Sequence, residues 1–305
     1  MRGNEKVYLY KGYRSLGARC SMNEIHFNPK AGSERITLIQ PSKGWGSLGL
    51  GEVWPYKDLL WFHTLKEIKS KYRQMALGPL WIVLQPIVNM LLFSFVFGKI
   101  AKLPSEGVPY PIFTLVALLP WIFFQNACTF ACNSLVQQME VISKVYFPRV
   151  IIPIASTISW LMDFCISFVF LLILMFIYGY IPGWRVVFLP LFLLFVTVFA
   201  LSIGFSTAAL AVKYRDVKFM VTYGLRALMY LTPVAYSGKL VPAHWLWAYK
   251  LNPMYWVIEG FRWCLIGTTF APGWDMTIPI TATFAVLVFS LYLFNRTQRT
   301  VVDLL

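Results

Sequence analysis

Residues 187–211 read VFLPLFLLFVTVFALSIGFSTAALA, a run of 25 residues without a charged side chain. An α-helix rises about 1.5 Å per residue, so about 20 apolar residues cross the hydrocarbon core of a bilayer. Five other stretches have the same character, and the apolar residues do not alternate with polar ones, as they would in a membrane β-barrel. The sequence therefore predicts an all-α membrane protein with six transmembrane helices, at residues 80–98, 112–136, 150–179, 187–211, 219–236 and 277–294.

The charge distribution predicts the orientation of these spans. The chain has 305 residues, of which 58% are hydrophobic and 13% charged, and its formal net charge is +14. The basic residues concentrate before the first span and after the second, fourth and sixth spans, whereas the opposite loops carry fewer for their length. By the positive-inside rule, both termini are expected in the cytoplasm. The basicity is then explained by orientation and by contact with anionic membrane lipids, and no nucleic-acid partner is expected.

Three regions are expected along the chain. Residues 1–55 are polar and Gly-rich and have no leader-peptide pattern, which favours a cytoplasmic N-terminal arm. Residues 56–77 form an amphipathic helix whose apolar stripe is Trp61, Leu65, Ile68, Tyr72 and Met75. Such a basic helix before a span is expected in the membrane interface, although packing on the arm would produce the same pattern. Gly78-Pro79 ends it, and residues 78–305 form the transmembrane domain.

Polar residues inside the spans are costly and therefore informative. Gln85 and Asn89 share one face of the first span, and similar polar sets recur in the second, third and fifth. Each set either lines an aqueous path or joins helices by hydrogen bonds. Asp163 and Arg226 each need a partner or water, and they are candidates to pair with each other.

Two connecting segments have unusual compositions. Residues 240–268 contain two apolar pieces of about half-membrane length joined at Asn252-Pro253, which predicts an external re-entrant helical hairpin. Its many aromatic rings suit either the headgroup level of the membrane or stacking on sugars. The cytoplasmic loop 137–149 is apolar where water would favour polar residues, a feature typical of a surface that binds a partner protein.

Several motifs in this order resemble the permeases of type-2 ABC exporters of polysaccharides. The first is Lys71–Trp81 (KYRQMALGPLW) followed by Gln85-Pro86. The others are Pro120-Trp121, Lys144–Arg149 (KVYFPR), Tyr214–Val217 (YRDV), Thr232–Tyr236 (TPVAY) and Leu251–Met254 (LNPM) with Glu259 and Arg262. The resemblance covers about residues 36–305. It implies a homodimer in a bacterial inner (plasma) membrane, paired with two copies of an ABC ATPase subunit, that exports a lipid-linked polysaccharide such as O-antigen, capsule or teichoic acid.

The resemblance also assigns roles to residues. Loop 137–149 corresponds to the element that couples to the ATPase, with Glu140, Val141, Ile142, Ser143, Lys144, Val145, Tyr146, Phe147, Pro148 and Arg149. Helix 56–77 corresponds to the cytoplasmic gate, with Lys69, Lys71, Tyr72 and Arg73 at the substrate entrance. The spans matching pore-forming helices carry the aromatic residues Trp81, Trp121, Tyr230 and Tyr236. The hairpin corresponds to the external mouth, with Asn252, Pro253, Trp256, Glu259 and Arg262.

The chemistry of the chain agrees with a transport subunit that is not itself an enzyme. No Gly-rich phosphate loop of the Walker type occurs, so ATP and Mg are expected on the partner subunit, and no cofactor, catalytic residue or metal site is expected here. A membrane glycosyltransferase would need clustered carboxylates near a membrane face, and an ion channel or proton-coupled transporter would need relays of ionisable residues. The sequence shows neither pattern, so both alternatives are disfavoured. An exporter of drugs or small lipids is the main alternative within the family. Such exporters usually have a larger external loop between the first two spans than this chain has.

Overall fold

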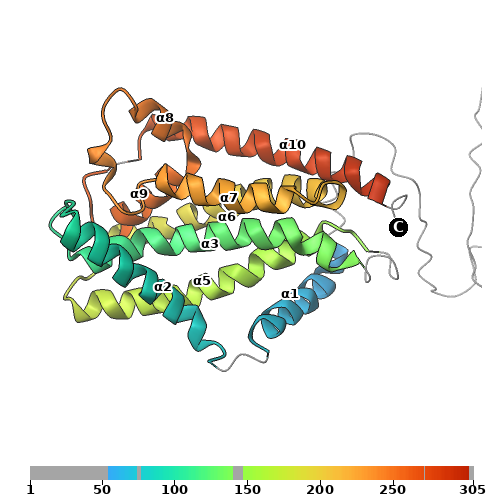
Figure 1. Ribbon diagram of the computed structural model, residues 1–305, viewed down its shortest axis with the longest axis horizontal. Coiled ribbons are helices and arrows are strands. Elements are labelled where there is room, and N and C mark those ends of the chain that lie inside the picture. Colours follow the sequence, from blue (N-terminus) through green and yellow to red (C-terminus); the bar gives the residue numbers. More distant parts are fainter. Residues whose placement is uncertain (1–53, 74–76, 140–146, 271, 302–305) are drawn as a thin grey trace, which may run out of the picture. The chain divides into compact units, whose positions relative to one another are not determined.

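The computed structural model describes residues 54–73, 77–139, 147–270 and 272–301, all within the compact unit Lys43–Leu305. The regular elements in these ranges are helices (Figure 1). Five helical segments are long and apolar enough to cross a membrane: Leu80–Ile100, Tyr110–Gln137, Ile151–Ile177, Trp184–Lys213 and Trp274–Thr297. They correspond to the first four predicted spans and the sixth, so the prediction of an all-helical membrane protein is confirmed.

The helices follow one another with short connections. Their bounds are α1 (Lys57–Tyr72), α2 (Leu80–Phe93), α3 (Tyr110–Gln137), α5 (Ile151–Ile177), α6 (Leu189–Lys213), α7 (Val217–Tyr230), α8 (Leu246–Leu251), α9 (Pro253–Leu265) and α10 (Thr277–Val301). A π-helix, η2 (Ser94–Ile100), continues α2. Single turns of 3-10 helix are η1 (Trp54–Tyr56), η3 (Trp184–Phe188), η4 (Gly238–Leu240) and η5 (Trp274–Met276).

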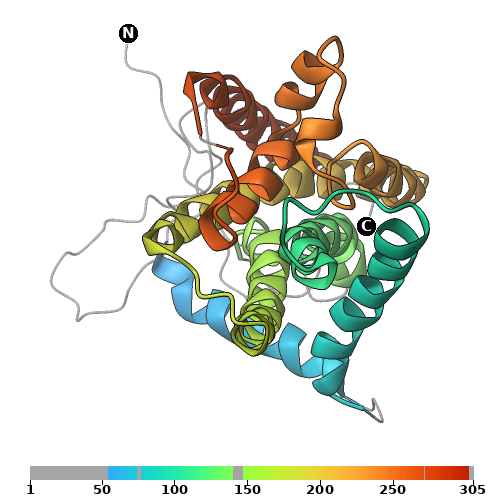
Figure 2. The ribbon, with the colours of Figure 1, turned by 90° about the vertical axis from the view of Figure 1, so that its left-hand side faces the viewer.

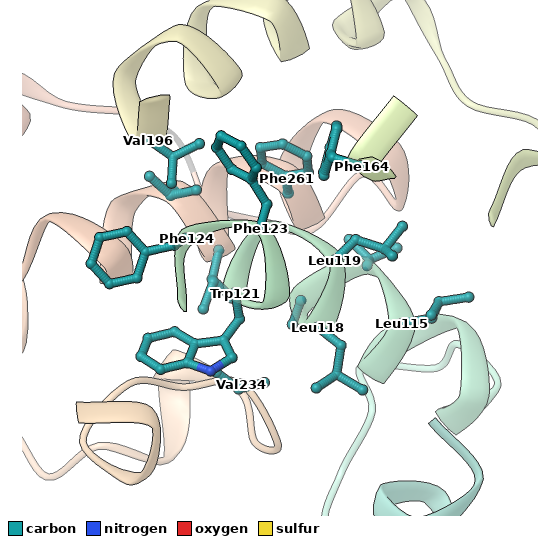
Figure 3. Packing of buried hydrophobic residues seen from close by; sticks show 14 of the residues in the cluster. Leu115, Leu118, Leu119, Trp121, Phe123, Phe124, Phe164, Val196, Val234 and Phe261 are labelled. Carbon is teal, nitrogen blue, oxygen red and sulfur yellow. The ribbon is translucent and has the colours of Figure 1, made fainter. Parts of the chain in front are cut away.

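Helix α3 is the centre of the bundle. It packs against α2, α5, α6, α7 and α9, and Figure 2 shows it end-on among them. The aromatic rings of Phe123 and Phe261 each pack edge-on against Phe164, with centroids 5.8 and 6.0 Å away (Figure 3). On another side of α3, the buried Trp121 points toward Val234. Because α3 is covered on so many sides, it can hold polar side chains away from lipid.

The fifth predicted span, 219–236, is not confirmed as a membrane-crossing helix. Helix α7 ends at Tyr230, and its 14 residues correspond to about 21 Å, shorter than a hydrocarbon core of about 30 Å. The chain then turns through Leu231–Tyr236. Pro233 explains the end, since proline has no backbone N–H to donate within a helix. The predicted count of six helical spans is therefore not confirmed.

Two helices occur where a helical hairpin is predicted. They are α8 and α9, joined at Asn252, whose side-chain oxygen accepts a hydrogen bond from the backbone N–H of Met254 at 3.0 Å. Pro253 occupies the first turn of α9, where its missing N–H has no cost. The depth of this pair in a membrane, and the side of the membrane on which each terminus lies, stay predictions.

Helix α1 packs on α5 through a polar face. His63 and Thr64 are its buried residues, whereas Trp61 of the predicted apolar stripe is half-exposed. Tyr72, farther along the stripe, faces the Asp163 carboxylate of α5, so the Trp61 end of the stripe rather than its whole length suits contact with lipid, and Met75 lies outside the described residues. Beyond α1, Gly78 has φ +49°, a left-handed conformation that glycine adopts easily, and the chain enters α2 there.

Candidate functional site

A cavity of about 560 Å³ lies where α1 meets α2, α3 and α5. Helix α1 contributes charged and hydroxyl groups to its lining, α2 and α3 contribute amides, and aromatic rings come from α2, α3 and α5. The polar and aromatic residues of this first cavity include Lys66, Glu67, Ser70, Lys71, Tyr72, Trp81, Gln85, Asn126, Phe130, Gln138, Ser156, Trp160 and Asp163. Its volume lies in the range of about 300–1,000 Å³ that is usual for small-molecule sites.

An ion pair joins α1 to the membrane-spanning part of α5 in this cavity. The Nζ of Lys71 lies 3.1 Å from Oδ2 of Asp163, and the two side chains are 11% and 9% exposed. The same ammonium lies 3.6 Å from the ring centroid of Trp160, a cation–π contact. The expectation that Asp163 pairs with Arg226 is therefore wrong, because a cation of α1 reaches this carboxylate.

A second polar cluster lies one turn earlier on α1. The Glu67 carboxylate accepts hydrogen bonds from Ser156 Oγ at 2.8 Å and from Gln138 Nε2 at 3.3 Å. Burial raises the pKa of Glu67, although the Ser156 hydrogen bond and the nearby lysines act in the opposite direction. Burial likewise lowers the pKa of Lys71, against the attraction of Asp163. Both groups are thus held in a site that disfavours isolated charge, and each is stabilised by its partners.

The four residues predicted at a substrate entrance divide into two pairs. Lys71 and Tyr72 line the first cavity, and Tyr72 also interacts with Asp163. Lys69 and Arg73 are exposed and lie outside that lining. Of the basic residues predicted at the entrance, the one that borders this cavity is therefore Lys71.

A second cavity of about 360 Å³ adjoins the first one, between α2, α3 and α7. Gln85, Ile122 and Asn126 line both. Among the predicted channel aromatics, Trp81 lines the first cavity, and Trp121 and Tyr230 line the second.

The fourth predicted channel aromatic, Tyr236, lies outside the lining of both cavities. Its hydroxyl group is 2.9 Å from that of Tyr249. Gln85 and Asn89 of the first predicted span and Asn126 of the second all border the second cavity. Thr129 and Asn133, which share a helix face with Asn126, donate instead to backbone carbonyl oxygens of their own helix.

The five residues predicted at an external mouth form a structural cluster. Arg262 is fully buried, and its guanidinium pairs with Glu259 at 2.9 Å. It also donates to the carbonyl oxygens of Val234 and Tyr236, at 2.9 and 3.0 Å. Trp256 is buried and donates to a backbone carbonyl, while Asn252 and Pro253 begin α9. Arg262, together with Asn252, which donates to Thr232 Oγ1 at 2.9 Å, thus holds the chain after α7 in place.

The predicted coupling loop is described only at its ends. Residues 140–146, which include Glu140, Val141, Ile142, Ser143, Lys144, Val145 and Tyr146, lie outside the described residues. Phe147 is buried and packs with residues that begin α5, and Pro148 and Arg149 follow it. On the other side of the gap, Gln138 contacts Glu67 of α1. The chain just before the gap thus lies beside the first cavity, which Gln138 lines.

Sequence reasoning missed the carboxylate and the ring that complete this cavity. Glu67 lies on the face of the predicted helix 56–77 opposite its apolar stripe, and Trp160 lies within the predicted apolar span 150–179. A signal was present, since Ser156, Trp160 and Asp163 recur every three or four residues and so share one face of a helix.

Comparison with known proteins places the chain among export permeases. It is 31% identical over 186 residues to the "O-antigen export system permease protein RfbA" of Myxococcus xanthus, which covers 61% of this chain and 70% of the relative. It is 23% identical over 252 residues to the protein of that name from Klebsiella pneumoniae, covering 81% and 95%. It is also 22% identical over 241 residues to the "Polysialic acid transport protein KpsM" of Escherichia coli, covering 77% and 92%. Residues 58–266 match the family described as "ABC-2 type transporter". The resemblance noted in the sequence motifs is thereby confirmed, and the chain belongs to the ABC-2 type transporter permease family.

Proposed function

We propose that this chain is the channel-forming subunit of an ATP-driven exporter that moves a lipid-linked, O-antigen-like polysaccharide from the cytoplasm across the inner membrane. The observation that carries the proposal is the first cavity, which combines a lysine, carboxylates, amides and aromatic rings beside apolar helices. Such a substrate has a lipid tail, a phosphate link and sugars, and each part finds matching chemistry there. The names of the relatives support the class of substrate.

The proposed order of contacts follows the two cavities. The phosphate link approaches Lys71 and Tyr72 in the first cavity, and the half-exposed Trp81 offers a flat face for sugar rings. The path continues past Gln85 and Asn126 into the second cavity. Aromatic stacking depends weakly on exact position, so successive sugars of a polymer can slide along it.

The proposed assembly has two copies of this chain and two copies of an ABC ATPase subunit, both chains of this protein having cytoplasmic termini. ATP and Mg bind to the ATPase, and this chain holds no cofactor. The loop 137–149 transmits the motion of the ATPase. The hydrogen bond from Gln138 to Glu67 couples the start of this loop to α1, so the motion reaches that helix. Helix α1 then acts as the gate of the first cavity.

Capsule or teichoic acid is the second candidate substrate, and a small lipid or drug is the third. The similarity to KpsM favours capsule over teichoic acid as the second candidate. The connection between η2 and α3, residues 101–109, is short, which disfavours the drug exporters with larger external domains. A membrane glycosyltransferase is the enzyme alternative, and it predicts loss of polymer rather than its retention inside the cell.

The test is the fate of the glycan in a strain lacking this chain. We expect surface polysaccharide to disappear and lipid-linked polymer to accumulate inside, with recovery when the wild-type chain is restored. Tyr146→Asp should abolish recovery and co-purification of the ATPase at normal protein abundance, because a new carboxylate in an apolar interface is costly, while Tyr146→Phe should restore both. Unchanged surface glycan, or ATP hydrolysis by this chain alone, would contradict the proposal.

A further inference from the structure

Arg226 is a cation of the second cavity that has no counterion in the described part of the chain. It lies in α7, nine residues after Val217, and its side chain borders the cavity between α2, α3 and α7. The ion pairs among the described residues do not include it, and its nearest recorded contact is the ring of Tyr223 at 5.8 Å. Its neighbours Gln125 and Asn126 are near the midpoint of the membrane-spanning α3. An arginine at such a depth normally faces a partner or a functional ligand.

The remaining polar groups of this cavity are mainly amides. Gln85 and Asn89 come from α2, and Gln125 and Asn126 come from α3. The indole N–H of Trp121 already donates to Oε1 of Gln125 at 3.1 Å, so Gln125 presents its NH2 group as the free end. No carboxylate lines this cavity among the described residues. An exposed guanidinium that shares a cavity lining with several amides is suited to a ligand that accepts hydrogen bonds and carries negative charge.

We propose that Arg226, with the amides of Gln85, Asn89 and Gln125, binds a phosphate or diphosphate group inside the membrane. The planar guanidinium can donate two parallel hydrogen bonds to phosphate oxygens, and the amides supply further donors. The site rests on the proposed function, since it receives the phosphate link of a lipid-linked substrate from the first cavity. Lys71 and Arg226 then act in sequence, because Gln85, Ile122 and Asn126 line both cavities.

A phosphate group here has two possible sources, an isoprenoid diphosphate carrier or a glycerophospholipid. The test therefore compares a polyprenyl diphosphate, the polyprenol of equal length and phosphatidylglycerol. The protein is the complex with its ATPase in detergent, with the native cysteines replaced and Met229→Cys introduced, because Met229 borders the cavity. The measurement is the rate at which a small thiol reagent modifies that position as each lipid is titrated.

We expect the polyprenyl diphosphate to protect the introduced thiol and the polyprenol to give no protection. Arg226→Gln should raise the half-protecting concentration by roughly 10- to 100-fold, the factor for hydrogen bonds to charged groups. Arg226→Lys should give an intermediate rise, since the charge remains and the bidentate geometry is lost. Arg215→Gln, an exposed arginine outside both cavities, is the matched control and should leave protection unchanged.

Four results decide the proposal. Equal protection of the wild-type and Arg226→Gln proteins would overturn it. Dissociation of two copies of the chain in Arg226→Gln would also overturn it, because Arg226 would then be the partner of a carboxylate on the second copy. Equal protection by phosphatidylglycerol would support the phosphate site and assign it to glycerophospholipids. If Arg226 governs protection while the strain lacking this chain still displays its glycan, the site stands and the proposed polysaccharide substrate falls.

Discussion

Removal of the Asp163 carboxylate tests whether the ion pair with Lys71 holds α1 against the bundle. At 3.1 Å, the Coulomb attraction is about 5 kcal/mol for an effective dielectric constant of about 20, before the cost of desolvation is subtracted. Loss of one partner from a buried pair costs about 3–5 kcal/mol. The ring of Trp160, 3.6 Å from the ammonium, remains as a partner, so we expect the lower end of this range, about 3 kcal/mol.

The expected result of Asp163→Leu is local release of α1 rather than global unfolding. A change of about 3 kcal/mol corresponds to a roughly 100-fold shift in the docking equilibrium. Hydrogen exchange measured by mass spectrometry should therefore become roughly 100-fold faster in residues 57–72, with α3 unchanged. The double variant Lys71→Met with Asp163→Leu should recover most of the protection, because no buried charge is left unpaired. Unchanged exchange in the single variant, or no recovery in the double variant, would refute the reasoning.

Three other outcomes follow from the described contacts. The pKa of Glu67 is raised in the fold, so above pH 4.5 the folded protein binds more protons than the unfolded chain. Docking of α1 should therefore weaken as the pH rises through the raised pKa of Glu67. Glu67→Gln should flatten this pH dependence in hydrogen-exchange measurements. Gly260→Ala should lower thermal stability by about 1–3 kcal/mol, since its Cβ would lie 2.2 Å from the Phe192 ring, whereas Gly224→Ala, with open space, should not. Arg262→Met should cost about 3–5 kcal/mol by thermal unfolding in detergent, because Glu259 loses its partner; stability equal to wild type would contradict its structural role.

The helices that cross the bilayer could be predicted from the sequence, whereas their partners could not. Continuous apolar runs predict α2, α3, α5, α6 and α10 because a membrane requires length and apolarity, which are local properties. The pairing of Asp163 depends on tertiary packing, and its partner Lys71 lies 92 residues away on another helix. The sequence shows that a buried carboxylate needs a cation, but the choice between Lys71 and Arg226 follows from which helix packs on α5.

The burial of α1 shows the same limit. Its apolar stripe is visible in the sequence, but its printed side-chain contacts to α5 are polar ones, through Glu67 and Lys71. A polar face can pack because α5 presents Ser156 and Asp163 in matching positions. The end of α7 could have been predicted, since Pro233 is a helix-ending residue within the expected span.

The buried Arg262 bears on whether the chain crosses the membrane an even or an odd number of times. Helix α7 covers about 21 Å of a core of about 30 Å, so non-helical chain covers the remaining distance of about 9 Å, which is less than two turns of helix. Backbone at that depth needs internal hydrogen-bond donors, and the guanidinium supplies two of them to the carbonyl groups of Val234 and Tyr236. With this substitute for helical hydrogen bonds, α7 and the segment after it would complete one crossing together. On that basis an even number of crossings, with both ends of the chain on one face of the membrane, stays a prediction.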